Sequence, residues 1–312
     1  MKISSLLLLV RPIVQIIYVN NKYNIDYNIV YEEEPIKQKW NGIAQHIAYY
    51  VTNNTDTIVL SFFSTLENVA IYSIYNLIVN GIKQMVLTLN AGIQPLFGNL
   101  LALNKIDELK MKFSEFEWRI HTIVTFLFSC VAVLIVPFIS VYTSGINDAE
   151  YYQPLFALCL TFAQAAYCIR LPYNTMVNAA GHYKQTQISA IIEMVLNLSI
   201  TIVLVFKYGL IGVAIGTLVA LTYRTIYLAC YLSRNIINYN FYHFIKNILV
   251  DILECCIILF LFSFVSNTCN NYLEWFYLSL KAVLISGMVI YVVNYFSYRK
   301  NLTSFINTVF KK

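Results

Sequence analysis

The sequence predicts an all-α fold, a polytopic membrane helix bundle with about nine transmembrane helices. Of its 312 residues, 59% are apolar and 12% are charged, whereas a soluble domain carries about 25% charged residues. The apolar residues form long blocks rather than short periodic stripes. In lipid, each backbone polar group must be satisfied within its own element, which favours helices for blocks of this length. The short alternating strands of a membrane β-barrel are not found in the sequence.

Nine apolar blocks follow one another along the chain, and a helix that crosses a membrane needs about 20 such residues. They are 1–19, 42–63, 70–100, 120–141, 153–180, 187–206, 209–232, 247–266 and 274–297. The first block is interrupted by Arg11 and Pro12, and no small-residue cleavage site follows it. We therefore interpret it as a shortened membrane helix rather than a signal peptide.

The basic residues of the connections predict the orientation, because cytoplasmic loops of membrane proteins are enriched in Lys and Arg. One set of alternate connections holds fourteen of them: 20–41, 101–119, 181–186, 233–246 and 298–312. The opposite set, 64–69, 142–152, 207–208 and 267–273, holds only Lys207. The first set is therefore predicted to be cytoplasmic, together with the C-terminus. The net charge of +5 is explained by topology, and no nucleic-acid partner is expected.

Motifs of catalysis or metal binding are absent from the sequence. There is no GxSxG, Walker loop or HExxH, and the outward connections are too short for a folded extracytoplasmic domain. Six of the seven cysteines lie in apolar blocks, and Cys269 lies in a polar connection. We therefore expect no enzyme activity, no metal and no cofactor apart from a coupling H⁺ or Na⁺.

Four basic residues lie deep within the apolar blocks: Arg11, Lys83, Arg170 and Arg224. Charged residues in membrane spans are costly and usually face a bundle interior or a wet cavity. One interpretation is structural, with ion pairs or side chains that reach to the interface. The other is functional: the four cations line one cavity and bind a pyrophosphate or another anionic head group, because guanidinium matches phosphate oxygens.

Asp56, Glu193 and Asn197 are the candidate residues for binding a coupling cation. Asp56 lies in the polar patch NNTDT at 53–57, and Glu193 and Asn197 share one face of a helix at spacing i, i+4. Carboxylate and amide oxygens bind Na⁺ or carry H⁺. The alternative is that Asp56 pairs with a buried Arg or Lys. Acidic residues near segment ends are expected at the membrane interface: Asp251, Glu254 and Glu274.

Small residues and prolines predict local features of the helices. Gly212 and Gly216 form a GxxxG motif, which allows close helix packing. Pro95, Pro137, Pro154 and Pro172 can kink or start helices.

Several segments together carry a resemblance to a known family. They are TDTIVLSFF at 55–63, VAIYSIYN at 69–76, GIKQ at 81–84, QPLFG at 94–98, AGHYK at 180–184 and YGLIGVAIGT at 208–217. In order and spacing, the sequence resembles Wzx-type polysaccharide flippases of the multidrug/oligosaccharidyl-lipid/polysaccharide exporter superfamily. The likeness runs over roughly residues 1–235, and the last two helices fit in position more than in motif.

The resemblance implies fourteen helices, with two six-helix lobes around a central cavity and a terminal helix pair. It implies alternating access in the cell inner membrane. The implied partners are membrane lipid and the substrate, an undecaprenyl-pyrophosphate-linked oligosaccharide flipped for capsule, O-antigen (lipopolysaccharide) or exopolysaccharide synthesis.

Aligned to the family, the chain corresponds to the second lobe and the terminal pair. The implied parts are 1–19 (helix six, shortened), 20–41 (cytoplasmic loop), 42–232 (six-helix C-terminal transport lobe), 233–246 (cytoplasmic linker), 247–297 (terminal helix pair) and 298–312 (cytoplasmic tail). Helices one to five have no counterpart, so a fragment or half of a split transporter is expected, with a missing N-terminal lobe as partner.

Three alternatives remain open. A cation-coupled drug exporter of the same superfamily should line its cavity with acidic and aromatic residues, whereas basic residues outnumber acids in these spans. A membrane polysaccharide polymerase or ligase needs a large outer loop. A non-functional remnant is compatible with the same fold.

Overall fold

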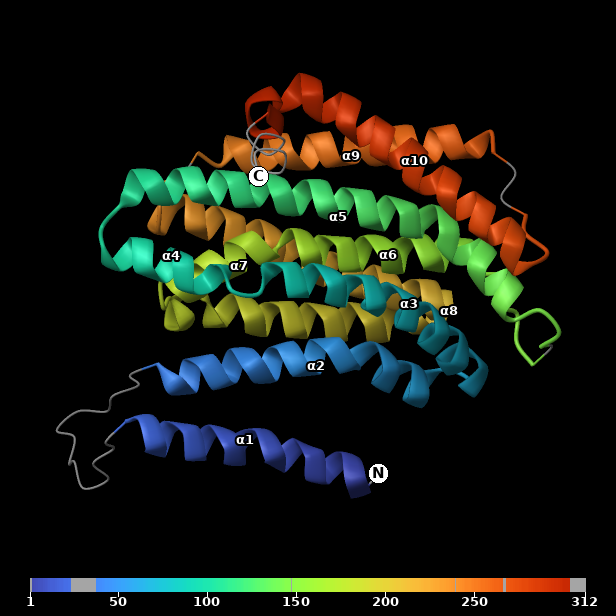
Figure 1. The fold of residues 1–312 in the computed structure, drawn as a ribbon. Helices are drawn as coiled ribbons and strands as arrows, with labels where there is room; N and C mark the ends of the chain where they lie inside the picture. The colour runs from blue at the N-terminus through green and yellow to red at the C-terminus, as the bar shows by residue number, and fades with distance from the viewer. Residues whose placement is uncertain (1, 24–37, 147, 239, 266–267, 304–312) are drawn as a thin grey trace. The chain divides into compact units, whose positions relative to one another are not determined.

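The structure is a computed structural model that describes residues 2–23, 38–146, 148–238, 240–265 and 268–303 (Figure 1). In these ranges every regular element is a helix, which confirms the all-α prediction. The chain divides into two compact units, residues 1–39 and 40–312, and each is described by itself.

The first unit contains α1 (Lys2–Lys22), which has Pro12 in its interior. It coincides with the first apolar block. In its last turn, Lys22 Nζ donates a hydrogen bond to Tyr18 Oη at 2.8 Å. Residues 24–37, with the acidic run at 32–34, lie outside the described residues.

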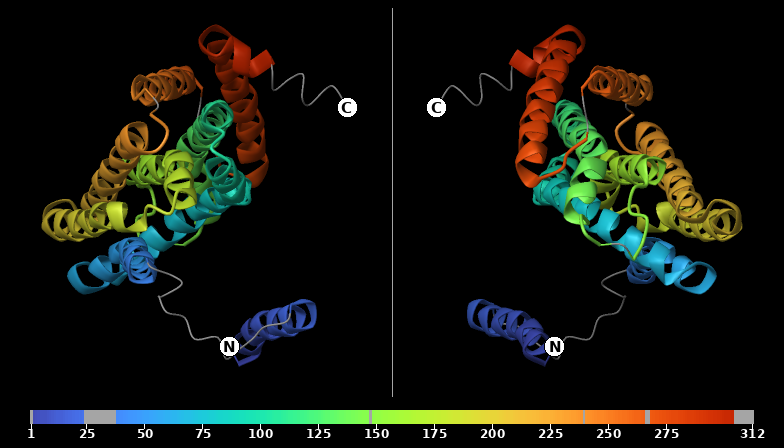
Figure 2. Two further views of the ribbon diagram at one scale, coloured as in Figure 1. Left: turned by 90° about the vertical axis from the view of Figure 1, so that its left-hand side faces the viewer. Right: turned by 90° about the vertical axis from the view of Figure 1, so that its right-hand side faces the viewer.

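The second unit is a helix bundle in which every predicted block coincides with helix. Its elements are α2 (Lys39–Phe63), α3 (Leu66–Asn90), α4 (Ile93–Ala102), α5 (Ile106–Tyr142), α6 (Pro154–Ile169), α7 (Leu171–Ala179), α8 (Tyr183–Asn235), α9 (Tyr242–Ser263) and α10 (Tyr272–Ser297). Helix α6 lies near the centre and packs against α3, α5 and α8, while α9 and α10 pack on α5 (Figure 2).

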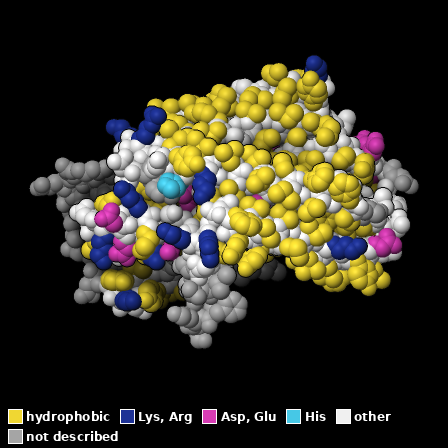
Figure 3. Space-filling model, turned by 90° about the horizontal axis from the view of Figure 1, so that it is seen from above, with side chains coloured by type: hydrophobic (Ala, Val, Ile, Leu, Met, Phe, Trp, Pro, Cys, Tyr) yellow, Lys and Arg dark blue, Asp and Glu magenta, His cyan; other side chains and the backbone are white. Residues whose placement is uncertain are grey.

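Five helical stretches are long and apolar enough to cross a membrane. They are Leu66–Ala102, Ile106–Tyr142, Pro154–Ala179, Tyr183–Asn235 and Tyr272–Ser297. Helices α1, α2 and α9 fall outside this set, and two of them carry acidic residues: Asp56 in α2, and Asp251 and Glu254 in α9. Figure 3 shows apolar side chains over most of one face, with charged side chains gathered toward one end. Such a surface suits a protein surrounded by lipid.

Two blocks predicted as single helices are each divided in two. Gly92, with φ of +89°, separates α3 from α4, because glycine adopts this left-handed backbone without a Cβ penalty. Arg170 lies between the end of α6 and the start of α7, which has Pro172 in its first turn. Because Pro172 has no backbone N–H, it cannot donate the hydrogen bond that would continue α6. The helix is therefore interrupted at Arg170, whose side chain is buried.

Helix α8 is a hairpin of two arms joined at Gly209, where φ is +54°. The GxxxG motif of the second arm packs against the first arm. A Cβ on Gly212 would lie 2.4 Å from the carbonyl oxygen of Leu204, and one on Gly216 would lie 2.3 Å from Thr201 Oγ1. These contacts confirm the predicted packing role, because only glycine allows so close an approach.

Helix α5 begins earlier than predicted, so much of the expected connection 101–119 is helical. Its first turns are amphipathic, with Leu109 and Phe113 fully buried. The opposite face carries solvent-accessible ion pairs, Lys112–Glu115 at 3.5 Å among them. A helix with one apolar stripe and paired charges can continue beyond the membrane-spanning part. The apolar block in the sequence is therefore shorter than α5 itself.

Candidate functional site

Asp56 is the centre of a buried polar cluster formed by α2, α3 and α8. Its side chain is 3% exposed. Both carboxylate oxygens accept from Thr217 Oγ1, at 2.7 and 2.8 Å, and Oδ2 also accepts from Tyr72 Oη at 3.1 Å. Its described partners are thus hydroxyl groups rather than the Arg or Lys of the alternative interpretation.

Asn197, from the first arm of α8, completes this cluster and is fully buried. Its Nδ2 donates to the carbonyl oxygen of Thr52 at 3.2 Å. Its Oδ1 lies 3.3 Å from Thr217 Oγ1 and accepts from Thr201 Oγ1 at 3.1 Å. The carboxylate of Asp56, the amide oxygen of Asn197 and the hydroxyl of Thr217 therefore converge, and such oxygens suit a small hard cation or a proton.

Lys83 reaches the same region from α3 and is 3% exposed. Its Nζ donates to Asn53 Oδ1 at 3.2 Å and lies 3.9 Å from the ring centroid of Tyr167. The Arg170 guanidinium lies 4.5 Å from the same ring. A cation close to an aromatic face is attracted by the ring quadrupole, so Tyr167 stabilises two buried cations at once.

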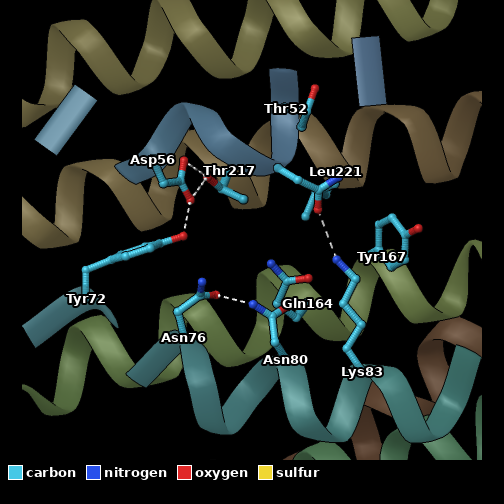
Figure 4. A pocket seen from close by; sticks show the side chains of 11 residues that line it. Thr52, Asp56, Tyr72, Asn76, Asn80, Lys83, Gln164, Tyr167, Thr217 and Leu221 are labelled. Carbon is cyan, nitrogen blue, oxygen red and sulfur yellow. Dashed lines mark hydrogen bonds between the residues drawn. The ribbon is translucent and has the colours of Figure 1, made fainter. Parts of the chain in front are cut away.

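A small cavity of about 20 Å³ connects Asp56 with Lys83, enough for about one water molecule. Figure 4 shows Asp56, Thr217 and Tyr72 at one end, Lys83 at the other, and Asn76 and Asn80 between them. Gln164 lines the cavity, and its Oε1 has no hydrogen-bond partner among the described residues. The cavity is therefore polar, and the Gln164 side-chain oxygen is available as a hydrogen-bond acceptor.

Arg170, Glu193 and Arg224 form a buried ion triad. Arg170 Nη1 donates to Glu193 Oε1 at 2.5 Å, and Arg224 Nη1 donates to Glu193 Oε2 at 2.7 Å. The three residues are 5%, 2% and 5% exposed. Arg224 also approaches Gln45 Oε1 at 3.4 Å. The triad joins both arms of α8 to the break between α6 and α7.

The structure thus places the predicted site residues in two adjacent groups. Glu193 and Asn197, one helical turn apart, belong to different groups: Glu193 to the triad, Asn197 to the Asp56 cluster. Lys83 meets Arg170 at the ring of Tyr167. Arg11 lies in α1, in the separate first unit, and its side chain is outside the described residues.

Four further members of the site were not predicted from the sequence: Tyr72, Tyr167, Gln164 and Thr217. Thr217 had a detectable signal, because it follows the GxxxG motif directly and interrupts an apolar run. The two tyrosines had none, since the chain contains 25 tyrosines.

A second buried polar network joins the terminal helices to α5. Asn294 of α10 donates through Nδ2 to Glu254 Oε1 at 2.8 Å and accepts from Trp118 Nε1 at 2.6 Å. Asp251 accepts from Thr125 Oγ1 at 2.9 Å and meets His121 Nδ1 at 2.5 Å.

Two acids of α9 that were expected at the membrane interface lie against neighbouring helices. Glu254 is 1% exposed, and the side chain of Asp251 is 12% exposed. Asp251 is paired with side chains of α5 and Glu254 with Asn294 of α10, and these polar partners offset the cost of burying the two carboxylates.

Neither a protein-family profile nor a curated protein matches the sequence. Among solved structures, the chain is similar to the lipid II flippase MurJ in an inward closed conformation, with a TM-score of 0.62 and 16% sequence identity. The alignment covers 84% of this chain and 53% of that one, so the chain spans about half the length of MurJ. With its series of apolar helices, the chain is a multi-pass membrane protein whose fold is shared with part of a flippase.

Proposed function

We propose that this chain forms one half of a transporter that flips a lipid-linked oligosaccharide across a membrane. The observation that carries the proposal is the burial of Lys83, Arg170 and Arg224 at adjoining positions on α3, at the α6–α7 break and on α8. The similarity in fold to a lipid II flippase supports it.

The chemistry of these cations favours a pyrophosphate group. Guanidinium groups donate parallel hydrogen bonds to phosphate oxygens, and a low-dielectric setting strengthens each contact. A carrier for cationic drugs would need a surplus of acids instead. The proposed substrate is an undecaprenyl-pyrophosphate-linked oligosaccharide for capsule, O-antigen or exopolysaccharide assembly, and the proposed location is the inner membrane with the C-terminus in the cytoplasm.

Asp56, Asn197 and Thr217 are proposed to bind the coupling cation, Na⁺ or H⁺. Glu193 lies one turn from Asn197 on α8 and links this cluster to the arginines. The small polar cavity between Asp56 and Lys83 connects the proposed cation site with the buried cations. A change of charge at the cation site would therefore alter the electrostatic potential at the buried cations.

The chain is proposed to work with a second lobe, present upstream or as a separate chain. Residues 42–232 would form one wall of the transport cavity, and 247–297 the terminal pair. Arg11 is proposed to line the cavity from the first helix once both lobes are assembled.

Binding by the full chain in lipid nanodiscs tests the function directly. Native mass spectrometry would follow binding of undecaprenyl pyrophosphate by the unchanged chain and by Lys83→Gln. Loss of one charged contact should weaken binding by about 10- to 100-fold. Lys207→Gln, at an exposed lysine of the same chain, serves as the control. Equal affinity of all three forms would contradict the proposal.

A further inference from the structure

Glu193 occupies the position between two guanidinium groups that an external anion would take. Each of its oxygens faces a different arginine, Oε1 facing Arg170 at 2.5 Å and Oε2 facing Arg224 at 2.7 Å. All three side chains are at least nine-tenths buried. The carboxylate therefore bridges the pair as a small bound anion would.

The positive charge around Glu193 exceeds what one carboxylate can neutralise. Arg170 and Arg224 both pair with Glu193, so two guanidinium charges share one carboxylate. Arg170 also shares the ring of Tyr167 with Lys83, which lines a cavity together with Asp56. Within the described part of the chain, no second carboxylate pairs with either arginine. Buried charge without full compensation is costly, and an additional anion would lower that cost.

A buried donor in the triad also has no acceptor. Arg224 Nε is inaccessible and has no hydrogen-bond partner among the residues described, whereas Arg224 Nη1 and Nη2 are engaged by Glu193 and Gln45. Leaving a buried donor unsatisfied costs about 1–3 kcal/mol. A ligand with more oxygens than a carboxylate would satisfy it.

We infer that Glu193 is a resident anion that screens the arginine pair and that a diphosphate must displace it to bind. The inference rests on the proposed function and adds a specificity-determining residue to it. A singly charged anion gains no more from the arginines than Glu193 does, and it must compete with a carboxylate that is always present at high effective concentration. A diphosphate carries more charge and more acceptor oxygens, and reaches both arginines and Arg224 Nε. Glu193 therefore rejects anionic phospholipids while admitting the diphosphate lipid.

Titration of the purified full chain with two probes tests this role. The probes are farnesyl diphosphate and phosphatidylglycerol, a singly charged phosphodiester lipid. The unchanged chain should bind the diphosphate at least about tenfold more tightly. Glu193→Gln should bind both probes more tightly, with the larger gain for phosphatidylglycerol, so that selectivity falls. Glu254→Gln, which removes a buried carboxylate from α9, should leave both affinities unchanged.

The outcomes separate this inference from the proposed function. A purely structural Glu193 would make Glu193→Gln bind the diphosphate more weakly, because the arginines would lose their alignment. Weaker or unchanged binding by the variant, with binding by the unchanged chain intact, overturns the inference alone. Failure of both forms to bind the diphosphate overturns the proposed function as well.

If Glu193→Gln aggregates during purification, a more conservative variant provides the same test. Glu193→Asp retains the charge but is one methylene shorter, so it reaches only one arginine. Its selectivity for the diphosphate should lie between those expected for the unchanged chain and for the glutamine variant. Selectivity equal to that of the unchanged chain would count against the displacement of Glu193.

Discussion

Gly216 and Thr201 face each other across the two arms of α8, so closely that a Cβ on Gly216 would lie 2.3 Å from Thr201 Oγ1 and 2.9 Å from its backbone nitrogen. The neighbour of Gly216 in sequence is Thr217, the hydroxyl that joins Asp56 and Asn197. The close packing of the hairpin therefore sets the position of a residue in the candidate site.

Gly216→Ala is expected to destabilise the protein by about 1–3 kcal/mol, since a methyl group forced into a filled space displaces backbone. Thermal unfolding in detergent, followed by the fluorescence of attached thiol dyes, measures the change. Gly81→Ala is the matched control, because a Cβ at that helical glycine meets nothing within 4 Å. Alanine there should be neutral or stabilising. Equal melting temperatures for the two variants would show that the arms do not pack as described.

Thr217→Val should weaken the Asp56 cluster while keeping the shape of the side chain. The hydroxyl bonds to a buried carboxylate, and a hydrogen bond to a charged group contributes about 1.5–3 kcal/mol. We expect a lower melting temperature and the loss of any stabilisation by added NaCl over KCl. Thr222→Val, at an exposed threonine of the same arm, should do neither. Retention of the salt response in Thr217→Val would exclude this hydroxyl from the cation site.

Asn294→Ala should loosen the attachment of α10 to α5 and α9. The amide supplies a donor to Glu254 and an acceptor to Trp118, and loss of buried hydrogen bonds costs about 1–3 kcal/mol for each group affected. Limited proteolysis between α9 and α10 should become faster. Asn235→Ala, which removes an exposed side chain at the end of α8, provides the comparison. No change in cleavage for Asn294→Ala would mean that apolar contacts alone hold the terminal pair.

Cys269 tests both the topology and a local electrostatic effect. Partial burial and the Glu274 carboxylate raise the pKa of this thiol above its ordinary value. Since the thiolate is the reactive form, labelling by a membrane-impermeant maleimide should be slow at neutral pH and rise with pH. It should occur from the outer side of intact cells, and Cys269→Ser should abolish it.

Glu274→Gln should accelerate the labelling of Cys269 at neutral pH, because removal of the negative charge lowers the pKa of the thiol. Labelling only after the cells are opened would reverse the predicted orientation of the connection 267–273.

The helices were predictable from sequence because lipid requires long apolar blocks, and every block coincides with helix. The breaks within the helices were less predictable. Pro172 indicated a kink or a start, but only the structure shows that the break falls at Arg170 and directs that arginine toward Glu193. The length of α5 was underestimated because its first turns are stabilised by the packing of Leu109 and Phe113 and by ion pairs rather than by a long apolar block.

The members of the candidate site were partly predictable, whereas their partners were not. Depth in an apolar span identified Asp56, Lys83, Arg170, Glu193, Asn197 and Arg224 as unusual. Which acid meets which base depends on how the α8 hairpin is rotated against α2 and α6, and no local pattern encodes that rotation. Spacing placed Glu193 and Asn197 together, yet a single helical turn is enough to give them different neighbours.

The single-residue bend at Gly209 has a mechanical consequence. Gly212 and Gly216 pack closely against the opposite arm, so the two halves of α8 cannot slide or separate without losing this contact. The two arms are therefore expected to move as one rigid body. Asn197 and Thr217 belong to this hairpin, whereas Asp56 belongs to α2. A movement that opens the proposed cation site would therefore occur between α2 and the hairpin, and binding of one ion there would constrain both arms of α8 together.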